Sequence, residues 1–294
     1  MESDNTELIE GVKTFFVVPD LSQMPEDFLL NFFLKGFETY YLLDDSSLDI
    51  RSKIQVLFSI FPSLILFFNT DREVCGIHWP DYIRSLKASY GDRAKIGVLF
   101  SRQADEAVQQ SIEKTYLFDI GIYCGCIPME GSKARNLLLL MGVLTANEAR
   151  GRRKALRAIC DESCEFHFEI GGFEYKGWIR EISISHFSCV FDGFDPGLQM
   201  YEKVVDVRLK LAGTVCTADG VLFTKRKVDG VLLHIFIFRN SRNKTGLDPD
   251  TQAKVNAFIR SLFDRGIQSI AQKGFEAQKA KGENRLDSLR ASPA

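Results

Sequence analysis

The feature that most limits how this chain can fold is a change of hydrophobic pattern after Ala146. Before that residue, short apolar runs of strand length alternate with longer stretches of helical spacing. After it, apolar and polar residues alternate in short segments that are rich in β-branched and aromatic side chains, with glycine and aspartate between them. A chain of 294 residues is long enough for two domains. We therefore predict two domains of different architecture.

The first 147 residues predict a parallel sheet with helices on both faces. Strand-like and helix-like segments follow one another five times in succession, which is typical of an α/β domain. The expected strands are residues 13–18, 39–43, 64–68, 95–100 and 119–126, and the expected helices are residues 24–37, 48–61, 81–89, 104–117 and 132–146.

Three stretches of this domain resemble a response-regulator receiver domain. Residues 15–20 (FFVVPD) are similar to the first strand and its terminal acids, residues 62–68 (PSLILFF) to the third strand, and residues 126–128 (CIP) to the end of the fifth strand. The resemblance covers roughly half of the chain. It implies a flavodoxin-like parallel α/β fold for residues 1–147.

The residues that give receivers their chemistry are missing. Of the acid pair after the first strand only Asp20 remains, the phospho-acceptor aspartate would fall at Phe68 or Asn69, and the lysine before the last proline is Ile127. Mg²⁺ prefers oxygen ligands in octahedral geometry and has few here. We interpret the domain as a degenerate receiver, and keep phosphorylation of Asp71 as an alternative.

Residues 148–158 form a basic linker, with four cations between Gly151 and Ala158. Arg153 and Arg157 are four residues apart, which places them on one side of a helix or of an extended segment. A guanidinium is a planar fork that fits phosphate oxygens or the O6 and N7 atoms of guanine. Two such forks suit a guanine nucleotide, although a basic cluster by itself is more often a solvated surface.

Residues 159–273 predict a small antiparallel six-stranded β-barrel with a C-terminal helix. Tight turns are expected at Gly171-Gly172 and Asp229-Gly230. The helix begins after Asp248, at Pro249, and the polar residues 274–294 are expected to be a disordered tail. The strand-like segments are residues 164–170, 173–183, 187–191, 204–211, 213–217, 221–227 and 231–238.

Two motifs in this part of the chain resemble those of the PilZ domain family. Residues 153–157 (RKALR) match the arginine motif that precedes the family's barrel, with Arg152 before it, and residues 181–186 (EISISH) stand where the acid-x-serine motif belongs. PilZ domains are receptors for cyclic di-GMP. The resemblance implies that Arg153 and Arg157 contact phosphate and guanine, and that Arg152 reaches a phosphate or stacks on a base.

The second motif departs from the family pattern at both ends. By the resemblance, Ser183 supplies a hydroxyl and Glu181 accepts a hydrogen bond from guanine, but Glu181 is longer than the usual Asp or Asn, and His186 replaces a glycine. A position that needs positive φ or a close ligand approach would make histidine costly. The alternative is a barrel kept for its fold, with Ser183 capping a turn. The predicted ligand-binding residues are Arg152, Arg153, Arg157, Glu181, Ser183 and His186.

Other classes of site and partner are not expected. The formal net charge of -2 gives no field for long nucleic acid, and the longest apolar runs are too short to enter a membrane. Residues 1–10 are unlike a secretory signal, and the odd number of cysteines, seven, suits a reducing cytoplasm.

The cysteines lack metal-ligand spacing, so we expect no metal and no cofactor. The chain has no phosphate loop, nucleophile elbow or paired carboxylates, so we do not expect an enzyme.

The sequence therefore predicts a cytoplasmic two-domain receptor for cyclic di-GMP. Binding at the linker and the barrel surface would change the arrangement of the two domains, and a protein partner that the sequence does not identify would respond to it, with motility or surface behaviour implied by the family resemblance. The alternative is a nucleotide-independent interaction scaffold in which both domains are degenerate.

Overall fold

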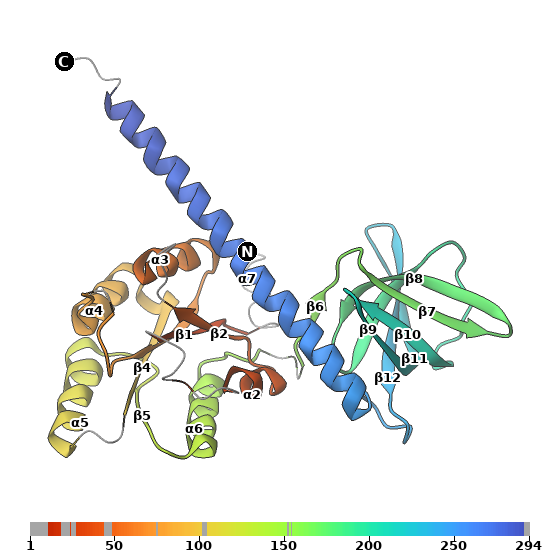
Figure 1. Cartoon of the computed structure of the whole chain (residues 1–294), viewed down its shortest axis with the longest axis horizontal. Helices are drawn as coiled ribbons and strands as arrows, with labels where there is room; N and C mark the ends of the chain where they lie inside the picture. The colour runs from red at the N-terminus through yellow and green to blue at the C-terminus, as the bar shows by residue number, and fades with distance from the viewer. Residues whose placement is uncertain are drawn as a thin grey trace. The chain divides into compact units, whose positions relative to one another are not determined.

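The computed structural model describes residues 11–18, 24, 28–43, 49–74, 76–101, 105–151, 153 and 155–290, without the side chains of residues 268–273, 275 and 277–290. The chain forms two compact units, residues 1–154 with 267–294, and residues 155–266. Each unit is taken by itself below, with element labels as in Figure 1.

The first unit contains a parallel five-stranded sheet in the order β2-β1-β3-β4-β5. This is the flavodoxin-like strand order, so the predicted fold is confirmed. The central strands are buried along their whole length, as expected when helices cover both faces of a parallel sheet. The strands are β1 (Thr14–Val18), β2 (Thr39–Leu43), β3 (Leu64–Asn69), β4 (Ala94–Ser101) and β5 (Cys126–Met129).

Polar side chains begin several of the helices in this unit. The Asp49 carboxylate accepts the backbone N–H of Ser52 (3.0 Å) at the start of α3, and Asp105 accepts that of Val108 (2.9 Å) at the start of α5. These are N-caps that satisfy amides which lack a partner within the helix. The helical elements are α2 (Phe28–Leu34), α3 (Ile50–Ile60), α4 (Trp79–Tyr90), the 3₁₀ turn η2 (Gly91–Arg93), α5 (Glu106–Glu113), the π-helix η3 (Lys114–Ile120) and α6 (Lys133–Ala146).

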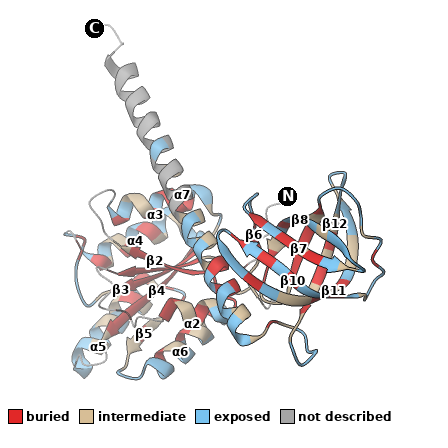
Figure 2. Cartoon of the chain, turned by 45° about the vertical axis from the view of Figure 1, so that its right-hand side comes forward, coloured by how far each residue is buried: buried red, intermediate tan, exposed pale blue. Residues whose placement is uncertain are grey.

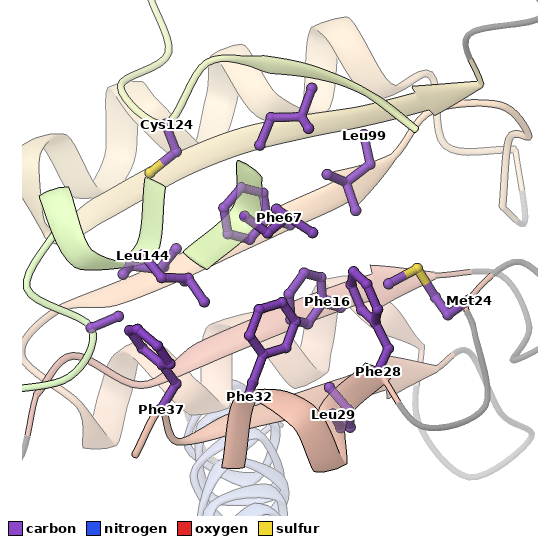
Figure 3. Packing of buried hydrophobic residues seen from close by; sticks show 14 of the residues in the cluster. Phe16, Met24, Phe28, Leu29, Phe32, Phe37, Phe67, Leu99, Cys124 and Leu144 are labelled. Atoms are coloured by element: carbon purple, nitrogen blue, oxygen red, sulfur yellow. The ribbon is translucent and has the colours of Figure 1, made fainter. Parts of the chain in front are cut away.

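Phenylalanine rings fill the core of the first unit on one side of the sheet (Figure 3). Phe16 of β1 stacks on Phe32 of α2 (centroids 5.7 Å apart) and on Phe67 of β3 (5.3 Å). Such ring pairs add to the area that each residue removes from water. The high phenylalanine content of the sequence is thus used to join α2 to the sheet.

The strand predicted at residues 119–126 is wrong. The chain stays helical from α5 through η3 to Ile120 and then forms β5 at Cys126–Met129. Tyr116 and Ile120 are buried at helical spacing, and Gly121 (φ 73°) ends the helix by donating its N–H to the Tyr116 carbonyl (2.9 Å). This stretch resembles a strand in the sequence because its apolar residues Ile120, Ile122 and Cys124 recur with a period of two.

The end of β3 holds no carboxylate at the two positions where the resemblance places the phospho-acceptor. Phe68 is fully buried against the Trp79 ring (5.3 Å), and the side chain of Asn69 accepts the Asp71 N–H (3.0 Å). The Asp71 carboxylate accepts the Ser101 N–H (2.7 Å) and so links the ends of β3 and β4. Asp20 lies outside the described residues. Within the described ranges, no group of three or more His, Cys, Asp or Glu residues could hold a metal ion.

The second unit is a closed six-stranded antiparallel barrel, as predicted. The sheet runs β6-β8-β7-β10-β11-β12-β9, the β8–β9 pairing closes it, and β6 adds to β8 from outside the ring. The strands are β6 (Ala158–Ile159), β7 (Cys164–Ile170), β8 (Phe173–Ile182), β9 (His186–Phe191), β10 (Lys203–Leu211), β11 (Thr214–Val228) and β12 (Val231–Arg239).

Two strands predicted at 213–217 and 221–227 are one long strand, β11. The break predicted between them is absent, because Ala218 and Gly220 stay paired with Val207 and Val204 of β10. The strand instead changes register at a bulge between Leu222 and Thr224.

Aromatic side chains fill the barrel, while the outward residues of its strands reach solvent (Figure 2). Phe187 of β9 stacks on Phe236 (5.1 Å) and Phe238 (5.3 Å) of β12. Because side chains alternate along a strand, the residues between these phenylalanines face outward and form the wall that carries the site described below.

The last helix, α7 (Pro249–Arg290), begins on the barrel, where the Thr251 hydroxyl donates to the Thr217 carbonyl (3.2 Å). Its buried residues there include Val255, Phe258 and Ile259. The backbone remains helical through residues 274–290, where disorder was predicted, because this polar segment is also rich in strong helix formers. None of the described helices is both long and apolar enough to cross a membrane.

Candidate functional site

The turn between β8 and β9 is built around the hydroxyl of Ser183. This side chain is fully buried, and its Oγ accepts the N–H groups of Ser185 and His186 (3.2 Å each). The same Oγ lies 2.9 Å from His186 Nδ1, which is also 3.0 Å from the Ser185 hydroxyl. A serine that bonds the backbone two and three residues ahead closes a tight turn. Ser183 thus has the turn-capping place that the sequence left open, and it fixes the orientation of the imidazole.

Histidine is accommodated at position 186 without backbone strain. His186 is not one of the described residues that have a positive φ. It begins β9, where it pairs with Ile237 of β12. The glycine usual at this position is therefore not needed for its conformational freedom here. What histidine changes is the wall of the site, where it adds an imidazole.

Arg157 and Glu181 form an ion pair at the edge of the barrel. Arg157 Nη1 lies 3.5 Å from Glu181 Oε2, and the two side chains are 35% and 41% exposed. The pairing of β6 with β8, which joins Ile159 to Glu181, brings the end of the basic linker beside this strand. An ion pair this open contributes only about 0–1 kcal/mol.

These residues line a pocket of about 430 Å³ on the outer wall of the barrel. Leu233, Ile235 and Ile237 of β12 provide half-buried apolar surface, since they alternate with residues that face the barrel core. The size and the mixture of apolar and polar groups are typical of a small-molecule site. The lining residues are Arg157, Arg180, Glu181, Ser185, His186, Ser188, Phe223, Thr224, Arg226, Leu233, Ile235, Ile237 and Thr245.

Two β-bulges decide which side chains reach the pocket. The register of β8 shifts between Ile179 and Glu181, so the successive residues Arg180 and Glu181 both line the pocket. The register of β11 shifts between Leu222 and Thr224, and Phe223 and Thr224 both line it as well. In a regular strand, one of each pair would point into the core.

The pocket is electropositive. Three arginines line it against one carboxylate, that of Glu181, which gives a net formal charge of +2. Arg157 is paired with Glu181, whereas Arg180 and Arg226 form no ion pair within the part of the chain that the structure describes. Guanidinium groups above apolar surface favour an anion that also carries flat, weakly hydrated rings.

The structure brings together part of the predicted ligand set. Arg157, Glu181 and His186 line the pocket, and Ser183 supports the turn beside it. Arg153 belongs to the other compact unit, which is not placed relative to the barrel. Arg152 lies outside the described residues.

Sequence reasoning missed Arg180, Arg226 and Phe223. The outward alternation of β11 and β12, whose register joins Arg226 to Leu233, could have indicated Arg226. Arg180 and Phe223 each stand at a bulge, where the alternation of the strand breaks, so alternation alone does not tell which residues there reach the pocket.

Comparisons with known proteins give structural matches only. No protein-family model matches the chain, and no curated protein matches its sequence. The C-terminal part is similar to PilZ domain proteins, as the two sequence motifs predicted.

One solved structure that matches is the PilZ domain of YcgR from Escherichia coli with c-di-GMP (19% identity, TM-score 0.34, covering 42% of this chain and 98% of that one). The c-di-GMP complex of MrkH from K. pneumonia is 16% identical (TM-score 0.35), covering 40% of this chain and 55% of that one. PlzA of Borreliella burgdorferi, also with c-di-GMP, is 13% identical (TM-score 0.24), covering 43% and 47%.

Proposed function

We propose that this protein is a cytoplasmic receptor for cyclic di-GMP, which binds in the pocket on the outer wall of the barrel. The ligand is a ring with two phosphodiester groups, each of which carries one negative charge, and two guanine bases. The function is binding and signalling rather than catalysis.

The observation on which this proposal depends is the charge and surface of the pocket. Three arginines and one glutamate give a formal charge of +2 over apolar surface from β12, which complements a dianion with flat bases. Because Arg180 and Arg226 form no ion pair among the described residues, binding a phosphate to them requires no existing bond to break. Charge-assisted, bidentate contacts of this kind are the strong hydrogen bonds of proteins.

The Arg157–Glu181 pair suits one guanine. A guanidinium fork can donate to O6 and N7, and a carboxylate beside it can accept N1–H and N2–H of the same or the neighbouring base. The two groups lie 3.5 Å apart and are partly open to solvent. We therefore assign the guanine contacts to Arg157 and Glu181. The proposed role of Ser183 is to hold the turn that presents His186 to the pocket.

The linker supplies the rest of the proposed site. Arg152 and Arg153 precede Arg157 by five and four residues, so a ligand held by Arg157 is within reach of their side chains if the linker folds onto it. In this proposal, residues 148–158 connect a degenerate receiver-like domain (1–147) to the PilZ-like domain (159–273). Ligand binding folds the linker onto the barrel, changes the arrangement of the domains, and thereby changes the affinity for a protein partner.

Isothermal titration calorimetry of the full chain with cyclic di-GMP tests the binding. We expect saturable binding to the wild-type protein. Arg157→Ala should reduce the binding free energy by about 1–3 kcal/mol, the value of a bidentate arginine–guanine contact. Arg208→Ala is the matched control, because Arg208 lies on β10 and lines a different surface hollow. Absence of binding to the wild-type chain would reject the receptor and favour the interaction scaffold. Equal losses for the two variants would reject the assigned guanine contact.

The proposed change of arrangement needs its own measurement. Small-angle X-ray scattering of the full chain with and without saturating cyclic di-GMP should show a change in radius of gyration. Arg153→Ala should reduce that change if the linker arginines hold the ligand. Identical scattering curves for a chain that calorimetry shows to be saturated would reject the change of domain arrangement, while the proposed binding of cyclic di-GMP would stand.

A further inference from the structure

An exposed aromatic pair stands at the rim of the pocket. Phe223 of β11 lines the pocket and is 44% exposed, and Tyr201, in the loop before β10, is 67% exposed. Their ring centroids are 6.4 Å apart at an interplanar angle of 77°, an edge-to-face contact. Exposed aromatic rings gathered at a pocket often belong to a binding surface, since two large apolar groups here remain in water.

The backbone holds this pair in place from both sides. Phe223 occupies the β11 bulge, where it is left outside the regular ladder and directed to the outer wall. Tyr201 has a φ of 68°, a conformation that bulky residues rarely adopt. Two backbone hydrogen bonds keep it there, from the Tyr201 N–H to the Leu222 carbonyl (2.6 Å) and from the Leu222 N–H to the Glu202 carbonyl (3.0 Å).

These bonds attach the Tyr201 backbone to the residue next to Phe223. The tyrosine ring lies at 77° to the phenylalanine ring, and this contact restricts the rotation of the Phe223 side chain. Arg180 lines the pocket from β8 and Arg157 from the residue before β6, whereas Arg226 lines it from β11, the strand that also carries Phe223. β12 provides apolar surface. The Phe223 ring has no hydrogen-bonding atom, so it suits the face of a ligand ring rather than its polar edge.

We infer that Phe223 is the stacking wall for a purine base in this pocket, and that Tyr201 is a positioning residue that holds Phe223 in place. This inference rests on the proposed function and adds a determinant of specificity to it. Every base has a π-face and aromatic side chains stack on it, so the wall selects for a flat ring, while the arginines select for its phosphates.

Calorimetry with cyclic di-GMP on surface variants tests the stacking wall. Phe223→Ala should weaken binding about 5- to 150-fold, which is the ~1–3 kcal/mol measured for base–aromatic stacking converted at 1.4 kcal/mol per tenfold. Phe194→Ala is the matched control. Phe194 lies in the β9–β10 loop, which also carries Tyr201, and its ring is almost fully exposed but does not line the pocket. It should bind like the wild type. Tyr201→Ala should lose part of the affinity, and Tyr201→Phe should restore it.

Salt dependence separates stacking from charge. The fold-loss for Phe223→Ala should be the same at low and high NaCl, whereas the fold-loss for Arg226→Ala should shrink as salt screens the phosphate contact. If Phe223→Ala binds like Phe194→Ala while Arg157→Ala is weakened, the stacking wall is rejected and the receptor stands. If the wild-type chain does not bind, both are rejected.

A second variant keeps the test decisive should Phe223→Ala fold poorly. Phe223→Trp retains a flat ring at the bulge and should bind within a few-fold of the wild type. Its added indole emission should change on saturation with cyclic di-GMP, since a stacked base alters the surroundings of that ring. Unchanged emission at saturation, after subtraction of the same titration of the wild type, would overturn the inference.

Discussion

Replacing Gly177 by alanine should open the barrel at its closing seam. Gly177 lies in β8 opposite Phe191 of β9. A Cβ at this position would lie 2.0 Å from the Val190 carbonyl oxygen and 2.9 Å from both the Phe166 ring and the Phe191 Cα. Carbon and carbonyl oxygen atoms on adjacent strands normally approach to about 3.3 Å. The two strands would therefore have to separate by more than about 1 Å at this pair.

The size of the effect follows from that separation. Ladder hydrogen bonds near 2.9 Å do not survive an added ångström, so about two of them would be lost, at about 0.5–1.5 kcal/mol each. Forcing a methyl group against Phe166 and Phe191 adds about 1–3 kcal/mol of overpacking. The expected loss of unfolding free energy for the barrel is therefore about 2–6 kcal/mol. Because β8 also carries Arg180 and Glu181, ligand binding should weaken as well.

Hydrogen exchange followed by mass spectrometry on the full chain measures the loss of stability separately for each of the two units. Peptides from β8 and β9 should lose protection in Gly177→Ala, while peptides from β1 and β3 in the first unit keep theirs. Gly220→Ala is the matched control, because Gly220 is also a strand glycine of the barrel, but the nearest atom to its Cβ would be an ordinary 3.5 Å away. It should stay within about 1 kcal/mol of the wild type.

Equal protection in the two variants would refute the reasoning. That result would mean that β9 does not pass Gly177 in the register found here, and that the β8–β9 pairing does not close the barrel at this point.

Two further predictions concern titration and phosphorylation. Burial lowers the pKa of His234 below its usual value near 6.5, although the neighbouring Asp195 opposes this shift. The unfolded chain therefore takes up the proton first as pH falls, so urea unfolding of the barrel should show stability decreasing below about pH 6.5, and His234→Leu should flatten that slope; equal slopes for both chains would contradict the assignment. Incubation with acetyl phosphate and Mg²⁺ should leave the mass of the protein unchanged, because the Asp71 carboxylate is bonded to the Ser101 amide (2.7 Å). An adduct mapped to Asp71 would instead revive the active receiver.

The sequence predicted most elements of both sheets because their patterns are local. Buried parallel strands such as β1 and β3 are continuous apolar runs, and the barrel strands alternate, so hydrophobic periodicity distinguishes the two architectures. The five-stranded and six-stranded sheets were predicted for this reason. The errors at 119–126 and 213–227 arose where the local signal matched the wrong structure. An alternating run continued a helix as far as Ile120, and the break expected between residues 217 and 221 lay inside a strand.

The arginine motif and the acid-serine motif also depend only on residue identity and spacing, and their resemblance to the PilZ motifs predicted, from the sequence by itself, that Arg157 and Glu181 belong to one site. Tertiary structure alone decided what surrounds them. Bulges in β8 and β11 place Arg180 beside Glu181, and Phe223 beside Thr224, on the outer wall. Closure of the barrel places β11 and β12 beside β9, so that Arg226 and the apolar face of β12 complete the pocket. A bulge inserts one extra residue into a strand, and no local sequence pattern predicts it here. Strands that are distant in sequence meet only when the barrel closes. For that physical reason, the charge of the site and its aromatic wall follow from the fold and not from the motifs.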